Sequence, residues 1–160
     1  MDVDIRKAGP EDADVVAGLV RALADYEKLP APGPDALARL AADFSGDRPR
    51  LEVWLAQRGG APVGYAATFE TYSTFRARPL LYLEDLFVLP EHRRAGVAKA
   101  LLRRLARRAK ERGCARVTWM VLDWNVDAQR FYERLGAKRE ASWWPFVLEG
   151  EALDRLADGG

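Results

Sequence analysis

The first part of the chain alternates a strand pattern with two helix patterns. Val3 to Arg6 alternates apolar and charged residues, which predicts a short strand. Pro10-Glu11-Asp12 begins a predicted helix that ends near Lys28, because apolar residues recur every three or four positions. After a proline-rich connector, Pro34 to Phe44 predicts a second helix. Two helices should therefore follow the first strand.

The middle of the chain predicts three strands. Leu51 to Ala56 and Val63 to Thr71 flank a turn rich in glycine and proline, so we expect them to form an antiparallel hairpin. A basic loop, Thr74 to Pro79, leads into the apolar run from Leu80 to Val88. We expect this run, which contains two adjacent acids, to be the central strand.

The remaining pattern predicts a long helix followed by shorter elements. Val97, Leu101, Leu105 and Ala109 recur at every fourth position, so they should form the buried stripe of a helix that Gly113 ends. The elements expected after it are a strand over Arg116 to Leu122, a helix over Asn125 to Leu135 ended by Gly136, one or two strands within Lys138 to Leu148, and a tail helix over Glu151 to Ala157.

This order of elements predicts the α/β class. A hairpin followed by strand, loop, helix and strand implies a mixed sheet with helices on both faces. The 160 residues are 49% hydrophobic, enough for one core and too few for two ordinary domains, so we expect a single domain over residues 1–160. The motif G-x-G-x-x-G is absent, which argues against a dinucleotide-binding fold.

Composition narrows the possible partners. The 25 basic and 24 acidic residues give a formal charge of +1, which favours neither nucleic acid nor an anionic membrane. The basic run between Lys99 and Arg112 is therefore interpreted as a solvated helix face. With Cys114 as the only cysteine and no long apolar run, we expect a cytoplasmic protein. His92 has no second histidine or cysteine at metal-ligand spacing, so no metal is expected.

The hexapeptide Arg93-Arg94-Ala95-Gly96-Val97-Ala98 is the main clue to a cofactor. It follows a strand-like run and opens a long helix, where free backbone N–H groups can hold a phosphate. Gly96 permits a turn that a Cβ would hinder, and the two arginines add positive charge. Taken alone, so short a motif is more often an ordinary loop-to-helix junction, so its context decides.

That context is a set of three motifs in order. They are Tyr82 to Val88, then Arg93-x-x-Gly96-x-Ala98, then Asn125-x-x-Ala128-x-x-Phe131-Tyr132. Together they resemble the GCN5-related N-acetyltransferase (GNAT) superfamily, whose fold has a mixed, mostly antiparallel central sheet. Within it the chain resembles the diamine acetyltransferase branch, especially its thialysine-acetylating members. Supporting matches are Leu23 to Glu27, Val121 to Asn125 and Gly150 to Ala152.

The resemblance implies acetyl-CoA as co-substrate and a homodimer as the assembly. The backbone after the two acids would pair with pantetheine like an added strand, and the hexapeptide would hold the pyrophosphate. The implied cofactor-binding residues are Leu86, Phe87, Val88, Arg93, Arg94, Ala95, Gly96, Val97, Ala98, Lys99, Asn125, Val126, Asp127 and Ala128.

Glu84 and Tyr132 are the catalytic residues that the resemblance implies. An alkyl ammonium has a pKa of roughly 10.4, so a group must take its proton before the nitrogen can attack. Glu84 can do so directly or through a water, and Tyr132 can protonate the departing thiolate. Without the resemblance, Glu84 would be a surface or salt-bridge carboxylate and Tyr132 an amphipathic core residue. Asn125 is also a good helix N-cap and can serve both purposes.

The implied reaction is direct acetyl transfer, in a ternary complex, to a primary amine of a small molecule. The implied substrate-binding residues are Tyr26, Glu27, Glu84 and Asp85, with Glu27 binding a distal ammonium. Arg76 and Arg78 disfavour long polycations and can attract a carboxylate, so a lysine-like or thialysine-like amino acid ranks level with a short diamine.

Three alternatives remain open at this point. The first is an acetyltransferase for a protein N-terminus or lysine. The second is a CoA-binding regulatory module without turnover, against which the presence of both Glu84 and Tyr132 argues. The third is a binding protein that uses its basic helix.

Overall fold

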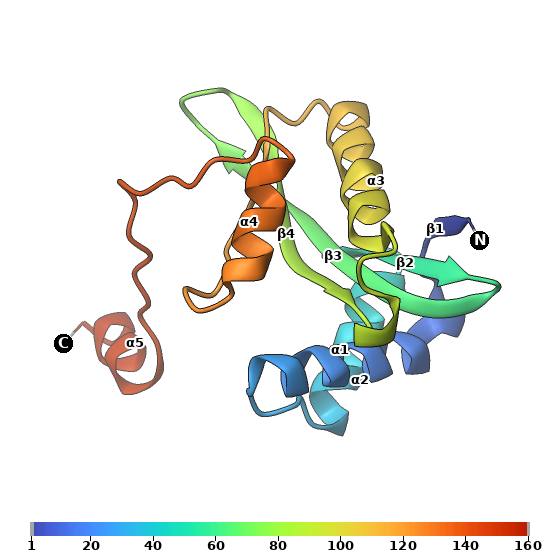
Figure 1. Ribbon diagram of the computed structural model, residues 1–160. Coiled ribbons are helices and arrows are strands. Elements are labelled where there is room, and N and C mark those ends of the chain that lie inside the picture. The colour runs from blue at the N-terminus through green and yellow to red at the C-terminus, as the bar shows by residue number, and fades with distance from the viewer. Residues whose placement is uncertain (1, 160) are drawn as a thin grey trace. The chain divides into compact units, whose positions relative to one another are not determined.

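The computed structural model describes residues 2–159 (Figure 1). The chain comprises two compact units, Met1–Met120 and Val121–Gly160. The first unit holds the whole sheet, and the second holds two helices joined by an extended segment. The expected single domain over residues 1–160 stays a prediction.

The first unit is built on a five-stranded sheet in the order β1-β2-β3-β4-β5. Neighbours are antiparallel except for β4 and β5, which are parallel, so the expected mixed α/β fold is confirmed. The strands are β1 (Val3–Lys7), β2 (Glu52–Arg58), β3 (Ala61–Ser73), β4 (Arg78–Val88) and β5 (Val117–Trp119). The middle of the sheet is β3, whereas β4, which we expected to be central, lies between β3 and the short edge strand β5.

Helices cover both faces of this sheet, as expected. The helical elements are η1 (Pro10–Asp12), α1 (Ala13–Glu27), α2 (Pro34–Ser45), η2 (Pro90–His92) and α3 (Val97–Glu111). The predicted stripe of α3, from Val97 to Ala109, is buried in one core cluster with Trp54 and Leu81. Val16 of α1 and Phe44 of α2 belong to the other cluster. The periodicity of the apolar residues therefore predicted which side of α3 is buried.

The glycine turn between β2 and β3 forms the predicted hairpin. Gly59 and Gly60 have φ values of 57° and 81°, the left-handed conformation that a two-residue hairpin turn of this type needs at both positions. The strands on either side pair antiparallel, so the hairpin prediction is confirmed.

The second unit contains α4 (Val126–Arg134) and α5 (Gly150–Ala157), close to their predicted bounds. The strands predicted within Lys138 to Leu148 are wrong, because this segment forms no strand among residues 2–159. A strand needs a partner for its backbone groups, and Pro145 also removes one N–H donor. The predicted strand over Arg116 to Leu122 is likewise shortened to β5.

Among residues 2–159, no helix is both long enough and apolar enough to span a bilayer. The cytoplasmic location stays a prediction.

Candidate functional site

Glu84 is the extra residue of a β-bulge in β4. Ala67 of β3 pairs with Asp85 and Thr68 pairs with Leu83, so Glu84 has no partner on β3. Its side chain is exposed. Bulges redirect side chains and often lie next to active sites. The predicted base is thus at the one irregular position in the pairing of β3 with β4.

The bulge reverses the two faces of β4. Before it, Leu81 and Leu83 pack into the α3 cluster, and after it Val88 does so, whereas Phe87 packs into the α1 and α2 cluster. In a regular strand, residues 81, 83 and 87 would share one face. The bulge therefore turns Phe87 toward the α1 side of the sheet. Asp85, which lies two residues before Phe87 in the strand, faces the same side.

The second half of β4 has an open side. Pairing with β5 ends at Leu83 and Trp119, so residues 84 to 88 have no strand partner on that side among residues 2–159. Leu89 N–H donates to the Val63 carbonyl at 2.9 Å. Because hydrogen-bonded pairs alternate in an antiparallel ladder, Leu86 and Val88 direct their backbone groups to the open side.

This alternation separates the three predicted pantetheine contacts. Leu86 and Val88 offer backbone groups on the open side, although the Val88 carbonyl also accepts a hydrogen bond from Arg93 Nε at 3.0 Å. Phe87 is opposite Tyr65, so its backbone groups point to β3. The geometry thus supports the backbone prediction for Leu86 and Val88 but not for Phe87.

Three carboxylates and one tyrosine lie near the bulge in the first unit. Tyr65 Oη donates to Asp85 Oδ2 at 2.9 Å. Burial raises the pKa of Asp85, and the hydrogen bond from Tyr65 opposes that shift. Burial, and then repulsion from Asp85, raise the pKa of both Glu27 and Glu84. The structure thus couples three of the predicted substrate-binding residues electrostatically.

Tyr26, the fourth predicted substrate-binding residue, lies at the end of α1 beside β4. Its ring centroid is 6.4 Å from that of Phe87. The guanidinium of Arg93 stacks 4.3 Å from the centroid of the Tyr26 ring and 5.7 Å from that of Phe87. Arg93 therefore joins α1 to β4, which places Glu27 and Asp85 on the same side of the sheet.

The loop before α3 has the features of an anion site. Arg94 and Gly96 have left-handed φ values of 60° and 81°. Among residues 2–159, no protein acceptor takes a hydrogen bond from the N–H groups between Arg94 and Lys99, and no side chain caps α3. Consecutive N–H groups at a helix N-terminus favour a phosphate. By contrast, the Arg93 N–H already donates to the Pro90 carbonyl at 3.2 Å.

Three of the seven basic residues between Lys99 and Arg112 form ion pairs. Arg108 binds Glu52 at 2.6 Å, Arg104 binds Glu111 at 2.8 Å, and Arg112 also binds Glu70. These pairs neutralise part of the charge of this basic run, which agrees with a solvated helix face. Among residues 2–159, no group of three or more potential metal ligands occurs.

The other predicted site residues belong to the second unit. Asn125 caps α4, with its Oδ1 accepting from Ala128 N–H at 3.3 Å, so the N-cap prediction is confirmed. Val126 and Asp127 form the first turn of the same helix. Burial raises the pKa of Tyr132 to about 12. Tyr132 is therefore a protonated phenol at neutral pH, the form that a general acid requires.

Two features were missed from the sequence. Tyr65 looked like an ordinary apolar strand residue, and only the register of β3 with β4 places it beside Asp85. Gly64 allows the two strands to approach, since a Cβ there would lie 2.5 Å from the Phe87 carbonyl oxygen. A tyrosine and a glycine next to each other in an apolar strand were the available signal.

Comparison with known proteins places the chain in a family. The model of the acetyltransferase (GNAT) family matches residues 16–137. The chain is 37% identical to the thialysine N-epsilon-acetyltransferase of Bos taurus, over 97% of each protein. It is 40% identical to an L-ornithine N5-acetyltransferase of Arabidopsis thaliana, over 58% of this chain and 41% of that one.

A solved structure agrees on the fold. An integron cassette protein from the mobile metagenome of V. cholerae superposes with a TM-score of 0.85 at 24% identity, over 98% of both chains. The chain therefore belongs to the acetyltransferase (GNAT) family and is an N-acetyltransferase.

Proposed function

We propose that the protein transfers an acetyl group from acetyl-CoA directly to a primary amine of a small molecule, within a ternary complex. The observation that carries this proposal is the β-bulge, which exposes Glu84 beside the open side of β4. The donor-rich turn from Arg94 to Lys99 follows the same strand. An acid near a strand-like binding edge and a phosphate site is the arrangement that an amine and a CoA thioester require.

The residues present fit acetyl-CoA, which supplies the reactive thioester. Arg94 to Lys99 would hold the pyrophosphate with backbone N–H groups, and the side chains of Arg94 and Lys99 add positive charge. Leu86 and Val88 would bind the pantetheine amides as an added strand. Asn125 to Ala128 would contact the same arm from α4.

The proposed chemistry divides proton transfer between two residues. Glu84 accepts a proton from the substrate ammonium, and the free nitrogen attacks the thioester carbonyl carbon. The C–N bond forms as the C–S bond breaks, and Tyr132 donates its proton to the departing thiolate. The nitrogen of the new amide loses its second proton to solvent, solvent returns a proton to Tyr132, and Glu84 releases the proton that it took from the ammonium. We propose that the two units form one catalytic domain, since the family match spans both.

The substrate class we propose is a short diamine or a lysine-like or thialysine-like amino acid. Two relatives are named for acetylating the terminal amine of an amino acid, thialysine and L-ornithine. Within one chain, Arg76 and Arg78 do not explain a preference for an amino acid, because they lie too far from Glu84 to bind the carboxylate of the same substrate. Arg78 is six residues before Glu84 on β4, which corresponds to about 20 Å at roughly 3.3 Å per residue. That distance exceeds the length of a lysine.

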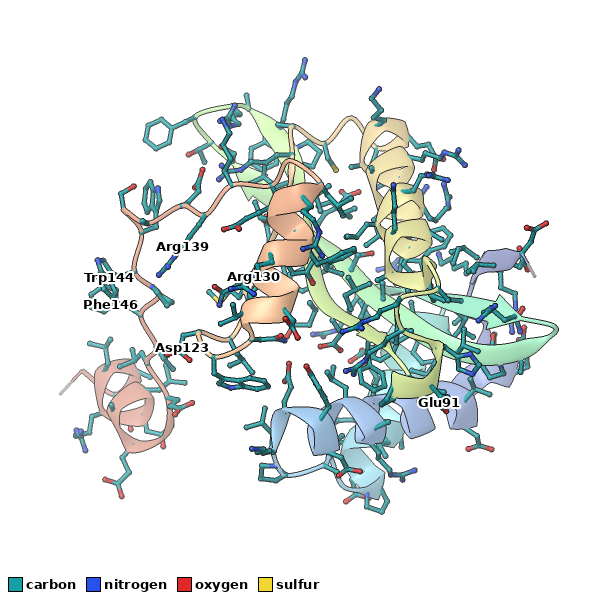
Figure 2. The ribbon with its side chains drawn as sticks, in the orientation of Figure 1. Glu91, Asp123, Arg130, Arg139, Trp144 and Phe146 are labelled. Atoms are coloured by element: carbon teal, nitrogen blue, oxygen red, sulfur yellow. The ribbon has the colours of Figure 1, made fainter. Side chains whose placement is uncertain are left out.

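We also propose that the protein is a homodimer. Trp143, Trp144 and Phe146 are 77%, 81% and 96% exposed, and Figure 2 shows the side chains of Trp144 and Phe146 projecting from the extended segment. Large apolar side chains gathered on a surface are typical of a contact with another chain. Light scattering on the purified protein would test this, because a monomer at all concentrations contradicts it.

The function is tested with a panel of amines. Thialysine, lysine, ornithine, short diamines, and peptides with a free N-terminus or a lysine side chain are incubated with acetyl-CoA, and products are identified by mass spectrometry. We expect acetylation of the small amines. Acetylation of peptides alone would identify a protein acetyltransferase, and no product from any amine would favour a CoA-binding module.

Glu84→Gln tests the base. We expect kcat/KM to fall on the order of 10²-fold, with unchanged acetyl-CoA affinity. Raising the pH should partly restore activity, because the free fraction of the amine increases. The exposed Glu11, in η1, provides the control variant Glu11→Gln, which should behave as wild type. A Glu84→Gln enzyme with a wild-type pH profile would contradict the assignment.

A further inference from the structure

Tyr65 is a buried tyrosine whose hydroxyl has one partner. Its side chain is 1% exposed, and its Oη donates to Asp85 Oδ2 at 2.9 Å. Among residues 2–159, Asp85 accepts no other side-chain hydrogen bond and forms no ion pair. Hydrogen bonds to a charged acceptor are shorter and stronger than neutral ones. Tyr65 thus fixes the direction of the Asp85 carboxylate.

The groups facing Asp85 are mostly acidic. Glu27 comes from α1 and Glu84 from the bulge of β4, and both are coupled to Asp85 by repulsion. The cation on this side, Arg93, uses its guanidinium on aromatic rings and on the Val88 carbonyl. Among residues 2–159, none of the three carboxylates forms a salt bridge.

This arrangement favours a positively charged ligand. Asp85 repels each of the other two carboxylates, and a bound ammonium would relieve that repulsion. The bulge separates them into two sets, because Glu84 is exposed at the bulge whereas Asp85 and Glu27 lie on the α1 side of the sheet. A substrate with two amines could place one near each set.

We propose that Tyr65 is a positioning residue that aims the Asp85 carboxylate, so that Asp85 and Glu27 together bind the distal ammonium of a two-amine substrate. The proposal rests on the proposed acetyltransferase function and assigns a specificity role within it. Glu84 serves the reacting amine, while the Tyr65–Asp85 pair recognises the other one.

The hydroxyl of Tyr65 also influences how Asp85 titrates. Its hydrogen bond lowers the pKa of Asp85 against the effect of burial. Removing it should raise that pKa, and Asp85 binds a cation only when ionised. Affinity for a two-amine substrate should then be lost at a higher pH than in the wild type. Glu27 and Glu84 titrate in the same region, so the comparison must be made between variants at each pH.

The test measures KM and kcat for 1,4-diaminobutane and for n-butylamine across a range of pH. Tyr65→Phe should raise KM for the diamine about tenfold, within the range for a hydrogen bond to a charged group. The KM for the monoamine should change much less, and kcat should change by less than about threefold. The acidic limb of 1/KM for the diamine should move to higher pH.

The substitution Tyr65→Phe is also made in an Asp85→Asn enzyme, so that the two changes can be compared singly and together. If Tyr65 acts through Asp85, Tyr65→Phe should add little further loss in the Asp85→Asn enzyme. Equal penalties on the two amines, or fully additive penalties with Asp85→Asn, would overturn the proposal. Circular dichroism and thermal unfolding should show that each variant remains folded.

A second measurement separates this proposal from the function on which it rests. Carboxyl ¹³C NMR titration of Asp85 should show a higher pKa in Tyr65→Phe than in wild type, and 1,4-diaminobutane should shift the Asp85 resonance. Wild-type protein that acetylates no small amine would contradict the proposed function. An Asp85 resonance insensitive to both the variant and the diamine would contradict the role of Tyr65.

Discussion

The strand β4 and the segment from Lys138 to Leu148 are both rich in large apolar residues, but only β4 buries them. Leu81 and Leu83 of β4 are each 2% exposed, whereas Phe146 is 96% exposed. The difference is pairing, since β4 lies between two strands and the C-terminal segment has no strand partner among residues 2–159. Apolar content alone therefore does not determine burial.

This contrast extends to the two units. The first unit has two buried core clusters, one on each face of its sheet, and holds the acids and the donor-rich turn of the candidate site. The second contains Asn125 and Tyr132, and its α4 and α5 contain no fully buried residue. The fold should thus depend mainly on the first unit, while the proposed chemistry needs both.

The largest expected effect concerns stability. Leu101 of α3 is 0% exposed and Leu156 of α5 is 62% exposed. Leu101→Ala should lower the free energy of unfolding by about 2–5 kcal/mol, because it removes buried contacts and leaves a cavity. The same change at Leu156 should stay within about 0.5 kcal/mol. Urea denaturation of both variants measures the difference.

An equal loss of unfolding free energy in Leu101→Ala and Leu156→Ala would contradict the expected difference between the two units. It would mean that the side chain of Leu156 is buried in solution, and dilution would then show whether a second copy buries it. Loss that depends on protein concentration would point to the proposed homodimer.

The sequence could predict whatever depends on local pattern. The stripe of α3, the glycine turn after β2 and the Asn125 cap all depend on residues close together in the chain. The bulge at Glu84 could not be predicted, because it depends on how β3 and β4 align over many residues. The contact of Tyr65 with Asp85 follows from that register and was missed for the same reason.

The C-terminal segment shows the opposite failure. The sequence predicted one or two strands within Lys138 to Leu148, yet a strand also requires a neighbour, which local pattern does not reveal. Among the site residues, the motif from Arg93 to Ala98 was placed correctly at a helix N-terminus. The sequence did not show that Arg93 has a structural role, whereas the residues after it keep free backbone N–H groups. That difference depends on the tertiary contacts of Arg93 with α1 and β4.

The next effect tests whether the second unit contributes to catalysis. Tyr132→Phe removes one hydroxyl and keeps the ring that packs 5.3 Å from Phe131, measured between centroids. We expect kcat to fall on the order of 10²-fold with little change in acetyl-CoA affinity. Because the pKa of Tyr132 is raised to about 12, the wild-type residue should remain an effective donor until the pH approaches that value.

Tyr72→Phe is the matched control for that substitution. Tyr72 lies on β3, is 63% exposed and belongs to no predicted site, so its variant should keep wild-type kcat. If Tyr132→Phe retained full activity in steady-state assays, proton donation by the second unit would be excluded. A loss of acetyl-CoA binding with normal kcat would instead indicate a packing role.

The smallest expected effect tests whether the first unit holds the phosphates. Gly96 and Gly60 both have φ of 81°, and at both positions a Cβ would meet no atom within 4 Å. Glutamate at either position should therefore cause similar backbone strain, on the order of 1 kcal/mol. Only Gly96→Glu also places bulk and negative charge at the N-terminus of α3, where an anion would bind.

We expect Gly96→Glu to weaken acetyl-CoA binding about tenfold in calorimetry, while Gly60→Glu loses similar stability but keeps wild-type affinity. Equal affinities in the two folded variants would remove the phosphate assignment from this turn, whereas equal losses in both would attribute the effect to destabilisation of the unit as a whole.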